Sequence, residues 1–178
     1  MPELSHEESD RLRRRVTGIV LSVVVSLLPL GARADRDEER RPSFGERIAG
    51  LYLSIDPAEA HVFQLNADGQ YTYMESQQFS GWSGGAAFSN ELGTWRRSGR
   101  RELIATSLHI EYGPDTRAFE GLTVLRRTFR FERGLNSFTV LCSGSSYAPG
   151  VDPFDAAAEA TSVFECPERS FRRVDADD

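Results

Sequence analysis

The stretch from His61 to Ser76, HVFQLNADGQYTYMES, decides the fold class of this chain. Apolar or aromatic residues alternate with polar ones on both sides of Asp68-Gly69, and this period of two is typical of a half-buried β-strand. An Asp-Gly pair suits the positive φ angles of a type I′ turn, which joins two antiparallel strands. The stretch therefore predicts a β-hairpin.

The same signals recur along the chain as far as Arg172. Short connections predict that successive strands are antiparallel neighbours, and an even number of them can close so that no edge stays exposed. The sequence thus predicts an all-β domain, an eight-stranded antiparallel up-and-down closed barrel. The predicted strands, enriched in β-branched and aromatic residues, are Ile48–Ile55, His61–Asn66, Gln70–Ser76, Glu91–Arg97, Glu102–Tyr112, Phe119–Glu132, Asn136–Ser146 and Thr161–Arg172.

The alternation in the fifth predicted strand indicates which side chains face the barrel interior. The more apolar set is expected to point inward, which leaves His109 in solvent as an ordinary surface residue. The inward set is Ile104, Thr106, Leu108, Ile110 and Tyr112.

Two longer loops, Gln77–Asn90 and Ala148–Ala160, break the regular spacing of the strands. Loops of this length at a barrel rim can form a lid over a ligand. The alternative is that they are plain connections, with Trp82 of the first loop packed over the barrel end as a plug.

Residues 1–34 have the three zones of a signal peptide. A basic segment, Arg11 to Arg15, precedes the apolar run Val16–Leu30, and Ala32-Arg33-Ala34 fits signal peptidase. We predict cleavage after Ala34 and a periplasmic or secreted protein with no membrane span in the mature chain. The alternative is an uncleaved anchor, but the apolar run is shorter than the roughly 20 residues that a spanning helix needs.

The mature chain divides into a linker and a barrel. Residues 35–42 are almost wholly charged and cannot bury apolar surface, so residues 35–45 are expected to be a disordered linker. Residues 46–175 then form the single β-barrel domain.

The two cysteines, Cys142 and Cys166, fall in the last two predicted strands, which are hairpin neighbours. If residue 142 lies opposite 166, residue 146 lies opposite 162, and the long loop is left free to connect the strands. An oxidising compartment permits a bond between them, so we predict a disulfide. The alternative is two buried free thiols.

Charge and motifs exclude several function classes. The net charge is −6, and the basic residues, all arginine, are scattered, whereas nucleic acid requires a basic patch, so we predict no nucleic-acid partner. The mature chain holds only the histidines His61 and His109, which does not suggest a Ser-His-Asp arrangement, and it shows no zinc-ligand spacing and no calcium-loop pattern. We therefore predict no catalytic residue, no metal site and no cofactor.

Four segments resemble the strands of small exported bacterial proteins with lipocalin-like barrels, the calycin architecture that also occurs in allene oxide cyclases. The similarity extends from Gly50 to Val140, and the resemblance implies a closed barrel that can hold a ligand. It carries no catalytic residues, and the Gly-x-Trp signature of the first lipocalin strand appears here only as Gly50-Leu51-Tyr52. The four segments are Asp68–Tyr73, Leu92–Arg97, Ile104–Leu108 and Arg127–Phe131.

Polar residues that break the inward apolar pattern are the candidate ligand contacts, because a polar group inside a barrel needs a partner, water or a ligand. The alternative is that each of these polar residues is an ordinary core or rim residue. Together with Trp82 above the barrel end, the candidates are Tyr71, Tyr73, Glu75, Thr106 and Arg127.

Arg127 is the most informative candidate. A continuous register points it into the barrel, where its guanidinium would pair with Glu75 or with a ligand carboxylate. The favoured alternative is a β-bulge near Arg126 to Thr128 that turns both arginines to solvent.

Three functions remain open. The first is an exported barrel that binds a small apolar or amphipathic molecule, such as a hydrophobic or carboxylate ligand, without covalent chemistry. The second is a cofactor-free cyclase or isomerase that uses the barrel cavity. The third is a solid barrel that serves as a scaffold for protein interaction.

Overall fold

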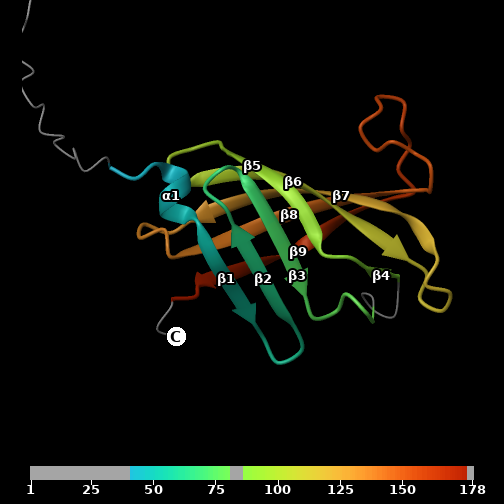
Figure 1. Cartoon of the computed structure of the whole chain (residues 1–178), viewed down its shortest axis with the longest axis horizontal. Helices are drawn as coiled ribbons and strands as arrows, with labels where there is room; N and C mark the ends of the chain where they lie inside the picture. The colour runs from blue at the N-terminus through green and yellow to red at the C-terminus, as the bar shows by residue number, and fades with distance from the viewer. Residues whose placement is uncertain (1–40, 81–85, 176–178) are drawn as a thin grey trace, which may run out of the picture. The chain divides into compact units, whose positions relative to one another are not determined.

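Within residues 41–80 and 86–175, which the computed structural model describes, nine antiparallel strands form one sheet that closes on itself (Figure 1). Eight of them make the barrel in the order β1-β2-β3-β5-β6-β7-β8-β9, and β9 pairs with β1. The ninth, β4, pairs with the end of β6 outside the barrel. The strands are β1 (Gly50–Ile55), β2 (Ala60–Leu65), β3 (Gln70–Glu75), β4 (Ala87–Phe88), β5 (Glu91–Arg97), β6 (Glu102–Tyr112), β7 (Phe119–Phe131), β8 (Ser137–Tyr147) and β9 (Ser162–Arg173).

The predicted fold class is confirmed, and β5 and β6 have the predicted bounds. The first strand was predicted too long, because a short helix, α1 (Phe44–Ile48), precedes it. Its first turn is held by a capping box, in which Ser43 accepts from the Glu46 amide and the Glu46 carboxylate accepts from the Ser43 amide. The Ser-x-x-Glu spacing was the available signal in the sequence. The predicted linker therefore includes the first residues of this helix.

Helix α1 lies at one end of the barrel and the β1–β2 turn lies at the other (Figure 1). The half of the barrel away from α1 is called the open half below. Ile48, the last residue of the helix, is fully buried, and the Tyr52 hydroxyl donates to the Ile48 carbonyl over 2.8 Å. Gly45 lies so close to the β2–β3 turn that a Cβ atom would be 2.5 Å from the Ala67 carbonyl oxygen. A side chain at residue 45 would therefore push the helix off the barrel.

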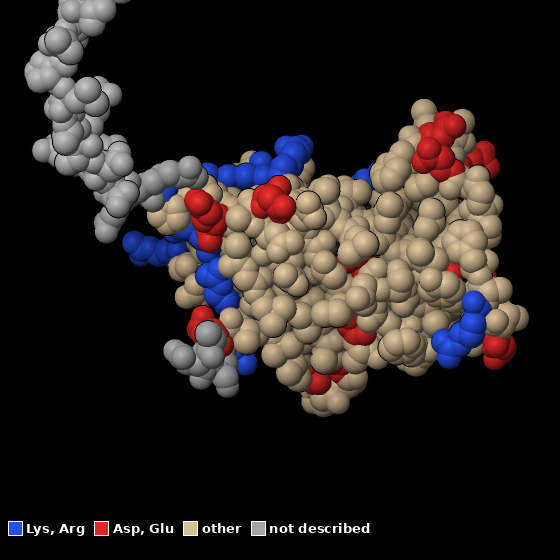
Figure 2. Space-filling view, viewed as in Figure 1, with Lys and Arg blue, Asp and Glu red and all other residues tan. Residues whose placement is uncertain are grey.

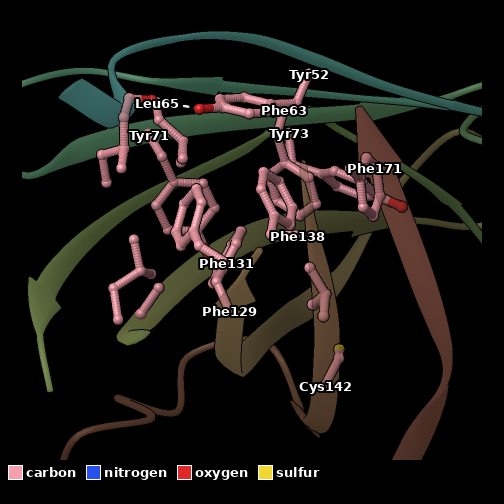
Figure 3. Close-up of a cluster of buried hydrophobic side chains, with 14 of the residues drawn as sticks. Tyr52, Phe63, Leu65, Tyr71, Tyr73, Phe129, Phe131, Phe138, Cys142 and Phe171 are labelled. Carbon is pink, nitrogen blue, oxygen red and sulfur yellow. Dashed lines mark hydrogen bonds between the residues drawn. The ribbon is translucent and has the colours of Figure 1, made fainter. Parts of the chain in front are cut away.

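The interior next to α1 is filled by aromatic rings (Figure 3). Phe138 lies at the centre, with ring centroids 4.7 Å from Tyr52, 5.1 Å from Phe129 and 5.2 Å from Phe171. Tilted and edge-to-face rings of this kind stabilise a core beyond the area that they bury. This half of the barrel is solid.

The predicted disulfide is present between Cys142 and Cys166. The predicted register is confirmed as well, because Cys142 lies opposite Cys166 and Ser146 lies opposite Ser162. The pairing of β8 with β9 shifts by one residue beside this bond, and Pro167, which has no amide hydrogen for the ladder, lies at the shift.

The predicted inward face of β6 is wrong. Leu103, Ala105, Ser107 and His109 are the buried residues of this strand, and Thr106, with Ile104, Leu108, Ile110 and Tyr112, belongs to the opposite, outer face. His109, expected in solvent, is only 9% exposed. The interior of the open half is polar, so the more polar face of the strand is the inner one.

The predicted signal peptide, its cleavage after Ala34, most of the charged linker and Trp82 lie outside the described residues. Among those that are described, no helix combines the length and apolar character required to cross a membrane.

Candidate functional site

The open half of the barrel contains a cavity of about 420 Å³. One part of its wall is apolar and is formed by Phe63, Leu125, Val140, Phe164, Phe171 and the disulfide. The other part is polar, with residues Glu59, His61, Tyr73, Glu75, Glu91, His109, Glu111, Arg127 and Arg169. The cavity therefore presents an apolar surface and ionisable groups to the same small volume.

Arg127 on β7 and Glu91 on β5 form a bidentate ion pair inside the barrel. The two terminal nitrogens of Arg127 donate to the two Glu91 carboxylate oxygens over 2.5 and 2.8 Å. The first nitrogen also donates to Ser107 Oγ over 2.9 Å and to the Tyr71 hydroxyl over 3.3 Å. The guanidinium carbon lies 4.9 Å from the centre of the Tyr73 ring. The charge is thus enclosed by hydrogen-bond acceptors and an aromatic face.

Both members of the pair are ionised. Burial by itself would raise the pKa of Glu91, but the Arg127 charge outweighs it and, with the hydrogen bonds from Arg127 and the nearby His109, lowers the pKa of Glu91 to about 2. Burial by itself would lower the pKa of Arg127, and Glu91 raises it instead. Arg127 is 6% exposed and Glu91 2%, so water screens neither charge.

Two interpretations of Arg127 are settled by this geometry. The predicted β-bulge is wrong, since β7 keeps one register with both β6 and β8 from Leu122 to Arg130. The predicted partner, Glu75, is also wrong, because Glu91 holds the guanidinium. Sequence reasoning missed Glu91. The available signal was Gly93, which shares a face of β5 with Glu91 because the two residues are two positions apart. A glycine is needed there because a Cβ would lie 2.4 Å from the Tyr71 ring.

His109 lies between two carboxylates on the cavity wall. Its Nε2 is 3.6 Å from Glu111 Oε1, and its Nδ1 is 3.9 Å from Glu91 Oε1. Glu111 Oε1 accepts from the hydroxyls of Thr123 and Ser146, which fix its position. Among the described residues, His109 Nδ1 is the buried side-chain polar atom that makes no hydrogen bond. It is the atom that most needs a partner.

The histidine makes stability depend on pH. Burial by itself would lower the pKa of His109, but Glu111 and Glu91 outweigh it and raise the pKa above its ordinary 6.5. Its stabilising charge is fully present below 6.5 and is lost as the pH rises through the raised pKa of the folded state. Urea unfolding between neutral and alkaline pH should show this loss, and His109→Asn should remove it. An identical pH profile in His109→Asn would contradict the assignment.

A second polar cluster joins β2 and β3 at the cavity. The Tyr73 hydroxyl donates to Glu75 Oε2 over 2.6 Å, and His61 Nδ1 is 2.7 Å from that hydroxyl. His61 Nε2 is 3.0 Å from Glu59 Oε2. These contacts form a continuous chain from Glu59 through His61 and Tyr73 to Glu75.

Glu59, His61 and Asp56 place ligand atoms within 4.8 Å of one another, a spacing that suits a metal ion. Arg169, however, donates to Asp56 over 2.8 Å and to Glu59 over 2.5 Å. A guanidinium already pairs with both carboxylates, so this cluster gives no support to a metal site.

The structure brings four of the sequence-predicted site residues together. Tyr73, Glu75 and Arg127 line the cavity, and Tyr71 lies beneath it, bonded to Arg127. Thr106 does not join them, because it lies on the outer face.

The described residues thus contain one cavity in which an apolar wall faces two histidine–carboxylate clusters. No protein-family model, curated protein or solved structure matches the chain. What the cavity does is therefore inferred from its own geometry.

Proposed function

We propose that this protein is an exported binding protein whose lipocalin-like barrel holds one small amphipathic molecule without changing it covalently. The observation that carries the proposal is the cavity of about 420 Å³, which has an apolar wall on one side and buried polar groups on the other. Ligand pockets are commonly about 300–1,000 Å³ and have this division. The cavity argues against the solid scaffold, because only the half of the barrel next to α1 is filled.

The polar wall favours a hydroxyl on the ligand over a carboxylate. Both terminal nitrogens of Arg127 already donate to Glu91, and Arg169 is paired with Asp56 and Glu59. A ligand carboxylate would therefore meet Glu91 and Glu111, whose pKa values are lowered, and the cation nearest to them, His109, already lies between these two carboxylates. A hydroxyl can satisfy His109 Nδ1 and also donate to a carboxylate.

Export is supported by two observations. The Cys142–Cys166 disulfide is of a kind that persists in oxidising compartments. The zones of residues 1–34 are those of a signal peptide, which would deliver the chain to the periplasm or the medium.

Filling the cavity should weaken binding. Val140 is 4% exposed and lines the cavity, and Leu141 beside it is 36% exposed on the outer face. In calorimetric titrations, phenylpropanol should bind the native protein one-to-one. Its affinity for Val140→Phe should be about tenfold or more lower. Its affinity for the matched control Leu141→Phe should equal that for the native protein. Phenylpropanoate, with the same ring and a carboxylate, should bind more weakly than phenylpropanol. Equal binding to both variants, or tighter binding of phenylpropanoate, would refute the proposal.

The hydrogen-bonded cluster of His61, Tyr73 and Glu75 favours one second candidate, a cofactor-free isomerase. Such a group beside an apolar wall could move a proton on a bound carbon acid. Mass spectrometry of a copurified ligand after incubation in deuterium oxide decides between them. Deuterium on carbon that disappears in His61→Gln would support the enzyme, and no incorporation would exclude it.

A further inference from the structure

Six arginines surround a groove at the end of the barrel that carries α1, opposite the open cavity. The groove has a volume of about 750 Å³, and Phe131 and Leu135 also line it. In Figure 2 most of the blue side chains lie at this end, where red ones also occur, and the tip of the loop at the other end is red. The arginines, which are far apart in the sequence, are Arg47, Arg97, Arg100, Arg101, Arg130 and Arg133.

The closure of the barrel brings them together. Arg100 and Arg101 lie in the β5–β6 turn, and the Phe131 amide donates to the Arg101 carbonyl over 2.8 Å, which joins that turn to the end of β7. Arg133 lies in the turn that follows β7. The hydrogen bonds between neighbouring strands therefore fix the positions of these arginines in the fold.

Arg97 is fixed in the wall of the groove. It donates to the carbonyls of Gly99 and Arg100 over 2.7 and 3.0 Å. Its guanidinium carbon lies 4.6 Å from the centre of the Phe44 ring of α1. The helix and the β5–β6 turn thus form one connected wall.

The charge of the groove is almost uncompensated. Its single acidic lining residue, Glu102, lies 3.5 Å from Arg130 and accepts a hydrogen bond from Ser98. Within residues 41–80 and 86–175, the side chains of Arg47, Arg100, Arg101 and Arg133 make no hydrogen bond or ion pair, and all four are exposed. This local excess of positive charge contrasts with a net charge of −6 for the whole chain.

We propose that this groove is a binding site for a soluble oxyanion that carries several phosphate groups. Planar guanidinium forks match phosphate oxygens, and several arginines around one groove suit a chain of linked phosphates. A groove suits a soluble ligand that enters it better than a flat membrane surface. The site is separate from the barrel cavity, so this proposal does not depend on the function proposed above. It also corrects the sequence-based view that the arginines are scattered.

The probe for this site is sodium tripolyphosphate, titrated into the purified protein at low and at physiological salt. Binding is expected one-to-one and should weaken as salt rises. The variant R100Q/R101Q/R133Q should weaken it about tenfold or more. The matched control R96Q/R117Q/R126Q removes the same charge from exposed arginines outside the groove and should change the affinity less than twofold.

Three results would overturn the proposal. They are no binding by the native protein, equal weakening in both triple variants, and binding to vesicles of anionic phospholipid without binding to tripolyphosphate. Circular dichroism of each variant checks the fold. If the groove variant is unfolded, R133Q alone is used in its place, and its affinity must fall more than that of R117Q.

Discussion

Replacing Arg127 by methionine is expected to lower the free energy of unfolding by about 3–5 kcal/mol. The substitution leaves Glu91 buried and ionised without the two hydrogen bonds that now satisfy its carboxylate. Ser107 and Tyr71 also lose the donor that they share. Chemical denaturation followed by tryptophan fluorescence measures the loss.

Two companion variants separate the ion pair from the side-chain volume. Arg126→Met, on the exposed outer face of the same strand, should change stability by less than about 0.5 kcal/mol. The double variant Arg127→Met with Glu91→Leu should be more stable than Arg127→Met alone, because no unpaired charge stays buried. A loss of less than about 1 kcal/mol in Arg127→Met would show that the guanidinium reaches solvent.

Replacing Phe138 by alanine is expected to cost about 3–5 kcal/mol in the free energy of unfolding. The phenylalanine is 1% exposed and contacts the rings of Tyr52, Phe129, Phe131 and Phe171. Its removal leaves a cavity that the surrounding strands, closed into a barrel, cannot collapse to fill. Figure 3 shows the ring among its neighbours.

Phe154 provides the matched control for this prediction. It is 61% exposed in the β8–β9 loop, so Phe154→Ala should change stability by less than about 0.5 kcal/mol. Thermal unfolding of both variants makes the comparison. Similar losses in the two would contradict the position of Phe138 at the centre of the solid half.

Strand positions and the cysteine register could be predicted from the sequence because both depend on local patterns. The bounds of β6 follow from its alternation and from the turns on each side, and the pairing of Cys142 with Cys166 follows from two adjacent strands. Neither requires knowledge of residues far away in the sequence.

The site was only partly predictable because its partners meet across the barrel. Glu91 and Arg127 are 36 residues apart, and nothing local to either indicates the other. The face of β6 was assigned wrongly for a related reason. Apolar residues were expected inside, whereas the open half contains a charged network that Ser107 joins by donating to Glu91.

Native mass spectrometry of the protein recovered from cells that naturally express it tests directly whether the barrel is a binding module. We expect a one-to-one complex with a small molecule that is released on unfolding, is present in Leu141→Phe and is lost in Val140→Phe. A protein that carries no molecule, or one that retains it in Val140→Phe, would contradict the proposed function.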